Sequence, residues 1–387
     1  MIRQELPGFE ECLKYSILAK RSFLTFVRKD FIEDKKEREK LEEETIAPQF
    51  LVERAVSNLL HGLRYRCKII NEVSQPFLTF DVEDDNDYKY DIRIIPDLNS
   101  LTIEEQRLLA KHMTIDYTLP ESQEGSGKPD QIFIGIVPWS IEDPEELDNN
   151  VTKLHHNVLK PSILVMDWLK HKFWVAGSMP NEALTYKYNN YNNYNNYNTN
   201  CSGNNLNISN GDRDHKIDLE HIEESKHDDD LRSDTNDISE TVESIRIKND
   251  FSEVHIEPSV RRYILDIMVH LRMHRLSYHS KGGGIIKDAL DSMILLCKLC
   301  SYDQGKMFVT PNIVKEMSFI YFPMHLILIN SARRDTSRLY GSSYKLIQEF
   351  LDNVSKVKLH MSNKLDNPLF LEYLVVQNVL NKIIPAI

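Results

Sequence analysis

No run of apolar residues in the sequence approaches the roughly 20 residues that a membrane-spanning helix needs. The first residues, MIRQELPGFEE, carry acids and a proline where a signal peptide would need an apolar stretch. Five cysteines in 387 residues, an odd number, do not form the pattern of a disulfide-stabilised secreted protein. We therefore expect an intracellular protein that does not enter the membrane.

Positive charge is also scarce, because 47 Lys and Arg residues face 59 Asp and Glu residues and give a net charge of −12. Nonspecific nucleic-acid binding needs clustered Lys and Arg, so we do not expect direct nucleic-acid binding. One local exception is the stretch RRYILDIMVHLRMHR, which could contact acidic partners or a nucleic-acid backbone, or could be the solvated side of an amphipathic helix. Its interaction candidates are Arg261, Arg262, Arg272 and Arg275.

Residues 179–253 divide the chain into two parts. They begin with an Asn/Tyr tract, YKYNNYNNYNNYNTN, and continue as an acidic, aromatic-poor stretch. Such a segment cannot bury enough apolar surface to offset the entropy of ordering, so it is predicted to be a disordered linker, with a partner-binding tract as the alternative. We therefore expect an α/β core in residues 1–178, the linker in 179–253 and a helical domain in 254–387.

The first part alternates helix and strand patterns, which is typical of an α/β layer architecture. QIFIGIVPW is a continuous apolar strand of the kind buried on both faces of a parallel sheet. Thr102 and Glu105 fit a capping box at the start of a helix. Helices are predicted over 8–31, 47–63 and 102–113, a helix that leads into a short apolar end is predicted over 161–177, and strands are predicted over 64–73, 77–82, 90–98 and 131–139.

The second part carries five amphipathic helix patterns. In one of them a single stripe contains Ile286, Leu290, Met293, Cys297 and Cys300. Another begins at a Thr-Pro pair and is interrupted by a proline at position 323. The helices are predicted over 257–276, 285–302, 310–329, 342–357 and 367–384.

The stretch EGSGKPD, residues 124–130, is similar to the end of a phosphate-binding loop. A working loop needs G-x-x-x-x-G-K-[ST] between a strand and a helix, but Ser122 stands at the first glycine and Pro129 at the magnesium-binding hydroxyl. Proline has neither a hydroxyl nor a backbone donor. A helix pattern precedes the stretch and a strand follows it, so we expect a polar turn.

Two other motifs have a residue composition that can form a binding site. CKLC, with His270 and His274 on the preceding helix, has zinc-ligand spacing, but its cysteines continue an apolar stripe and favour the core. KGGG, residues 281–284, could be an anion-binding nest or an interhelical turn, and the turn is favoured. We expect no catalytic residue, no metal and no cofactor.

The helices after the linker resemble the lid domain of the MoxR and magnesium-chelatase branch of AAA+ ATPases. The resemblance runs through PSVRRYILDIMVHLRMHRL and GGGIIKDALDSMILLCKLCSYDQGKMFVTPNIVKE, and IRIIPDLNSLTIEEQRLLAKHM is similar to the Walker B strand and the helix after it. Asp97 then falls at the magnesium-binding aspartate, but Leu98 replaces the catalytic glutamate, and Pro138 and Trp139 stand where a sensor asparagine is expected. The resemblance implies a degenerate AAA+-like protein that is not an enzyme. The alternative is a nucleotide-binding or weakly active relative that uses Asp97.

A resemblance over nearly the whole chain outside the linker is to the maintenance of telomere capping protein 2 family of budding yeasts. It is carried by LPGFEECLKYSILAKRSFL, WLKHKFW, RRYILDIMVHLRMHRL and NPLFLEYLVVQNVL. It implies a role in protecting chromosome ends, in the nucleus or the cytoplasm, with no known enzyme activity. We therefore expect a non-catalytic protein that acts through protein contacts. Within WLKHKFW, Trp168 and Trp174 are expected in the core, and Lys170, His171 and Lys172 are expected on the surface, with both lysines as interaction candidates.

Overall fold

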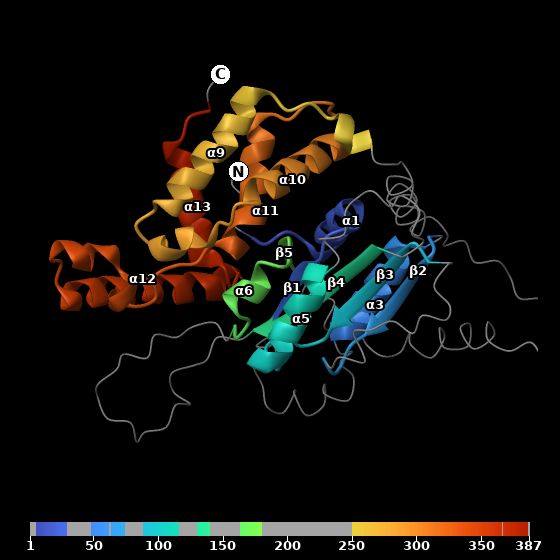
Figure 1. Ribbon diagram of the computed structural model, residues 1–387, viewed down its shortest axis with the longest axis horizontal. Coiled ribbons are helices and arrows are strands. Elements are labelled where there is room, and N and C mark those ends of the chain that lie inside the picture. Colours follow the sequence, from blue (N-terminus) through green and yellow to red (C-terminus); the bar gives the residue numbers. More distant parts are fainter. Residues whose placement is uncertain are drawn as a thin grey trace, which may run out of the picture.

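The computed structural model describes residues 5–28, 48–61, 63–73, 88–115, 130–139, 163–179, 250–365 and 367–385. A parallel sheet with flanking helices is followed by a helical C-terminal region (Figure 1). The strands are β1 (Phe23–Arg28), β2 (Tyr65–Ile69), β3 (Tyr90–Ile95), β4 (Asp130–Trp139) and β5 (Val175–Ser178). In the described part of the chain before residue 180, the helices are α1 (Phe9–Ala19), α3 (Pro48–Leu59), α5 (Ile103–Ile115) and α6 (Asp167–Lys170).

The five strands lie in the order β2-β3-β4-β1-β5, and all neighbouring pairs are parallel. This AAA+-like order confirms the predicted fold class. β3 is buried along its whole length, and β4 from residue 132 onward, as expected for central strands covered on both faces. Their Ile-rich sequences are the local cause, because β-branched residues pack well on a pleated surface.

Helices cover both faces of the sheet. α1 packs on one face, where the rings of Phe9 and Phe23 lie 5.5 Å apart. α5 lies on the opposite face, where Met113 lines the same pocket as Phe133 of β4. The predicted capping box begins α5, because the Glu105 carboxylate accepts from the backbone N–H and the hydroxyl of Thr102, both at 2.7 Å. These hydrogen bonds lower the pKa of Glu105.

Two predictions for the first part were wrong. The predicted helix over 8–31 ends at Ala19, and Lys20 turns the chain in the left-handed region with φ of 54° before β1 begins. The apolar residues from Phe23 to Val27 are all buried, so their pattern has no helical face and suits an interior parallel strand. The helix predicted within 161–177 reduces to the single turn of α6, and the apolar end that follows it pairs with β1 as β5.

The C-terminal region contains the five predicted helices. They are α9 (Pro258–Arg272), α10 (Ala289–Asp303), α11 (Pro311–His325), α12 (Tyr344–Leu365) and α13 (Phe370–Lys382), joined in part by the short helices η5 (His279–Gly284), η6 (Ala332–Arg334) and η7 (Thr336–Tyr340). Ile286 does not join the stripe predicted for α10, because it precedes the helix and is exposed. Pro323 does not interrupt α11 but lies within its last turn.

The helical region packs against the β5 side of the sheet, and one hydrophobic cluster runs through both parts. Trp174 Nε1 donates to the carbonyl of Ser292 at 3.3 Å, and Lys14 of α1 forms an ion pair with Asp303 of α10. α12 extends away from the sheet, to the left in Figure 1. A parallel bridge joins Gly8 to Ser178, the last residue of β5.

Several predictions fall outside the described residues. These are the strand over 77–82, residues 124–129 of EGSGKPD, and the linker from 180 to 249. Within the described ranges, none of the helices combines the length and the apolar character that crossing a membrane requires.

Candidate functional site

The carboxyl ends of parallel strands are the usual ligand-binding edge of an open α/β sheet. Here β1 and β4 end side by side, with Arg28 paired in register with Trp139. The indole of Trp139 is 1% exposed, and the Arg28 guanidinium lies 5.6 Å from the centre of its ring. A stacked arginine–tryptophan pair therefore occupies the edge at the point where these two central strands end.

Asp97 follows β3 at the same edge. Its Oδ1 accepts hydrogen bonds from the backbone N–H groups of Asn99 (2.8 Å) and Ser100 (3.2 Å), which is an Asx turn. Leu98 is fully buried, and its N–H donates to the carbonyl of Ile136 at 2.9 Å. The carboxylate at the magnesium position thus holds a turn, and the residue at the catalytic-glutamate position is part of the core.

Two polar side chains that sequence reasoning missed hold this edge together. Asn99 Nδ2 donates to the carbonyl of Pro138, and Asn99 Oδ1 accepts from the N–H of Leu164 at 2.9 Å. Gln106, which is 1% exposed, accepts from the N–H of Met166 at 3.0 Å. The amides therefore connect α5 and the end of β4 to residues 163–166. The sequence signal that could have revealed Gln106 is a polar residue on the inner side of an amphipathic helix.

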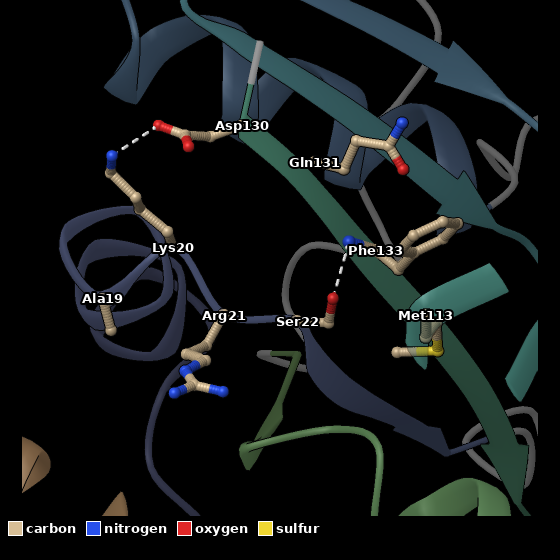
Figure 2. A pocket seen from close by; sticks show the side chains of 8 residues that line it. All are labelled: Ala19, Lys20, Arg21, Ser22, Met113, Asp130, Gln131 and Phe133. Carbon is tan, nitrogen blue, oxygen red and sulfur yellow. Dashed lines mark hydrogen bonds and ion pairs between the residues drawn. The ribbon is translucent and has the colours of Figure 1, made fainter. Parts of the chain in front are cut away.

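A pocket of about 260 Å³ lies at the opposite, amino edge of the sheet (Figure 2). Lys20 forms an ion pair with Asp130 at 3.0 Å, and Ser22 Oγ accepts from the N–H of Phe133 at 3.0 Å. Asp130, the last residue of EGSGKPD, begins β4, and α5 precedes the stretch. The expected order of helix before and strand after, the reverse of a phosphate-binding loop, is confirmed. The pocket is lined by Ala19, Lys20, Arg21, Ser22, Met113, Asp130, Gln131 and Phe133.

The four arginine candidates fall into two groups. Arg261 and Arg262 are exposed near the start of α9. Arg272 Nη2 donates to the carbonyl of Ile285 at 3.0 Å, so this side chain has a structural role between α9 and the loop before α10. Arg275 pairs with Asp335 at 2.5 Å while its own side chain stays 48% exposed.

The WLKHKFW segment is only partly as expected. Trp174 is buried, as predicted, but Trp168 is 38% exposed, because Leu169 takes the core position on the single turn of α6. Lys170 and Lys172 are half-buried rather than fully exposed. Lys170 forms an ion pair with Asp167 at 3.3 Å.

His171 of this segment meets His325 of α11 at the junction between the sheet and the helical region. The two Nδ1 atoms lie 3.3 Å apart, and His325 Nε2 lies 3.0 Å from the carbonyl of Trp174. The carbonyl can only accept, so Nε2 carries the proton and Nδ1 of His325 accepts from His171. Burial lowers the pKa of His325 to about 3 and also lowers the pKa of His171.

This junction should make folding sensitive to acid. A neutral histidine is favoured in the folded state, so the stability from His325 is present above its unfolded pKa near 6.5 and is lost as pH falls toward 3, by about 1.4 kcal/mol per pH unit. Between pH 6 and 4.5, we expect the free energy of unfolding of His325→Gln to fall less steeply than that of the unaltered protein. Urea titrations at several pH values measure this, and parallel profiles would contradict it.

The cysteines of CKLC behave as core residues. Burial raises the pKa of the Cys297 thiol well above its usual value and that of Cys300 to about 11, so both stay protonated at neutral pH. His270 is exposed and lies 2.8 Å from the carbonyl of Asp266, on the outer side of α9. Within the described ranges, His, Cys, Asp and Glu side chains form no group of three or more that could hold a metal ion.

Comparison with known proteins places the chain in a family. The model of the maintenance of telomere capping protein 2 N-terminal domain matches residues 7–178. A Saccharomyces cerevisiae protein called maintenance of telomere capping protein 2 is 35% identical over 397 residues, which is 99% of each chain. This chain belongs to the maintenance of telomere capping protein 2 family.

Two further members of the maintenance of telomere capping protein 2 family match the chain from end to end. The Vanderwaltozyma polyspora protein is 30% identical over 99% of both chains, and the Zygosaccharomyces rouxii protein is 29% identical over 100% of both. The matched N-terminal region ends at the last residue of β5, so it includes the whole sheet. Among solved structures, a "putative ATPase" from Cytophaga hutchinsonii covers 90% of both chains at 11% identity and a TM-score of 0.39.

Proposed function

We propose that this protein supports telomere capping as a non-catalytic scaffold with an AAA+-like fold, and that it acts through protein contacts. The observation that carries the proposal is that structural side chains fill the carboxyl edge of the sheet, where an ATPase would bind its nucleotide. Asp97 holds an Asx turn, Leu98 lies in the core, and the stacked pair of Arg28 and Trp139 occupies the ends of β1 and β4.

Hydrolysis of a nucleoside triphosphate needs a phosphate cradle, a bound metal and a group that orients the attacking water. An AAA+ protein would place its phosphate loop directly after β1. Here residues 29–47 follow β1, and their sequence has no glycine and more acidic than basic residues. Such a sequence offers neither the close backbone approach nor the positive charge that phosphate binding uses.

Protein contacts are supported by the outer face of α9. Leu265, Val269 and Met273 are 40%, 46% and 73% exposed, and their i, i+4, i+8 spacing places them in one row along the helix. Rows of exposed apolar side chains that are flanked by polar residues are typical of interaction surfaces.

The proposal predicts that Asp97→Asn leaves function unchanged. Asparagine keeps the oxygen that accepts in the Asx turn, so the stability should stay within about 0.5 kcal/mol, but it cannot replace a magnesium-binding carboxylate. The assay is restoration of telomere capping in Saccharomyces cerevisiae cells that lack their own family member, measured as single-stranded DNA at chromosome ends. The unaltered chain and the variant should restore capping equally.

The alternative is a nucleotide-binding relative, and the AAA+-like strand order favours it. Calorimetry distinguishes this alternative from a non-catalytic scaffold. With the full-length protein and millimolar MgATP, we expect no heat of binding. Binding of MgATP together with failure of a folded Asp97→Asn protein in cells would favour the alternative. Failure of the unaltered chain to restore capping would count against the telomere role itself.

A further inference from the structure

A basic surface in this acidic chain lies on η6, η7 and the start of α12. Residues 331–345 carry Arg333, Arg334, Arg338 and Lys345 and a single acid, Asp335, in a chain of net charge −12. The side chain of Asp335 has no exposed area and is paired with Arg275 at 2.5 Å. The segment therefore presents cations to solvent and no carboxylate.

α12 has a second apolar side beside this charge. Ile347 and Leu351 are buried against Ile329 and Ala332. Leu346, Phe350 and Val357, however, are 66%, 42% and 51% exposed, and their spacing of four and seven residues places them on one side of the helix.

Two more apolar side chains, Leu339 and Tyr340, precede α12 and are 84% and 88% exposed. We call these five exposed apolar residues and the neighbouring cations the α12 patch. Its members are Leu339, Tyr340, Leu346, Phe350 and Val357, with Arg275, Arg333, Arg334, Arg338 and Lys345.

Aromatic rings hold several of these arginines in place. Arg275 lies 5.8 Å from the ring centre of Phe350, and Arg338 lies 5.6 Å from that of Tyr344. Arg334 lies 5.3 Å from the ring centre of Tyr278. A guanidinium stacked on a ring keeps N–H groups at its edge that can bind a carboxylate in a bidentate way. Stacking also reduces the entropy lost when such a pair forms.

We propose that the α12 patch binds an acidic amphipathic helix of a partner protein, with aliphatic side chains on one face and Asp or Glu beside them. The aliphatic face would cover Leu346, Phe350 and Val357, and the carboxylates would pair with the arginines. This inference rests on the proposed function, because it names the class of partner that a scaffold would contact.

Charge and chemistry favour this occupant over others. A second copy would bring the same cations against each other, which is unfavourable across an interface. A nucleic-acid strand would use the arginines and the tyrosine, but it would leave Leu339, Leu346 and Val357 uncovered, since phosphates and sugars give aliphatic groups little to pack against.

The test is fluorescence anisotropy with the full-length protein and a labelled synthetic peptide of about three heptads, with Leu at the a and d positions and Glu at the flanking positions. We expect micromolar binding and at least a tenfold loss in two variants, Leu339→Ser with Leu346→Ser, and Arg334→Glu with Arg338→Glu. All four side chains are exposed, so the fold should persist. The matched control is Lys306→Glu with Met307→Ser, two exposed residues outside the patch, which should bind like the unaltered protein.

Four outcomes would overturn the proposal. The first is equal binding of a peptide with Lys in place of Glu. The second is tighter binding of an oligo-dT strand that the patch variants abolish, which would identify a nucleic-acid surface. The third is a dimer in sedimentation that Leu346→Ser dissociates. The fourth is that the peptide binds only after the Asp and Glu residues between 212 and 244 are replaced by serine. This result would identify that acidic segment of the same chain as the occupant of the α12 patch. Loss of capping by the unaltered chain is scored separately and bears on the proposed function alone.

Discussion

Replacing Gly284 by alanine is expected to lower the free energy of unfolding by about 4 kcal/mol, the range of the most damaging single substitutions. A Cβ at this position would lie 2.2 Å from the carbonyl oxygen of His325 and 2.9 Å from the backbone nitrogen of Ile327. Both are backbone atoms and cannot rotate away. Gly284 also has φ of +86°, which side-chain-bearing residues rarely adopt.

Gly282 provides the matched control in the same turn. It has φ of +58°, but a Cβ there would meet nothing within 4 Å. Gly282→Ala should therefore cost only the left-handed strain, about 1 kcal/mol. Urea denaturation followed by circular dichroism measures both losses, and similar values for the two variants would show that the contact with α11 is not tight. Because Gly284 packs on the end of α11, its variant should also disturb the histidine pair at the junction.

The second large effect is expected at Asp91, where asparagine should cost about 3 kcal/mol, as when one member of a buried ion pair is removed. Asp91 Oδ2 lies 2.9 Å from Arg93 Nε, and Oδ1 lies 3.2 Å from Arg66 Nε. The Asp91 and Arg93 side chains are 2% and 6% exposed. Loss of the carboxylate would leave the buried Arg93 guanidinium facing a neutral amide, while Arg66, whose side chain is 33% exposed, could turn to solvent.

Asp130→Asn is the comparison for this prediction. Asp130 pairs with Lys20, and the two side chains are 30% and 51% exposed, so water screens the pair. Its loss should cost less than about 1 kcal/mol. Urea denaturation at pH 7 compares the two variants. If Asp91→Asn costs no more than Asp130→Asn, the buried carboxylate does not stabilise the sheet.

The sequence by itself determined the features that depend on neighbours in the chain. The Ile-rich runs of β3 and β4, the buried stripe of α9 and the capping box at Thr102 were all predicted, because helical and strand periodicities are set over a few residues. The departures at Leu98 and Pro129 could also be read directly, since they depend only on the identity of the residue. The resemblance to the telomere capping family also depends on residue identity alone, because long segments such as WLKHKFW carry it.

The tertiary structure decided what depends on distant parts of the chain. Phe23–Arg28 became a strand because β4 and β5 pair with it on both sides, and a run in which every apolar residue is buried carries no period to reveal this. Asp91 and Arg93 lie two residues apart on one face of β3, so their proximity follows from the strand itself. Arg66 reaches Asp91 only because β2 pairs with β3. His171 and His325 meet across 154 residues. Such contacts form only when the fold closes, so local sequence patterns do not contain them.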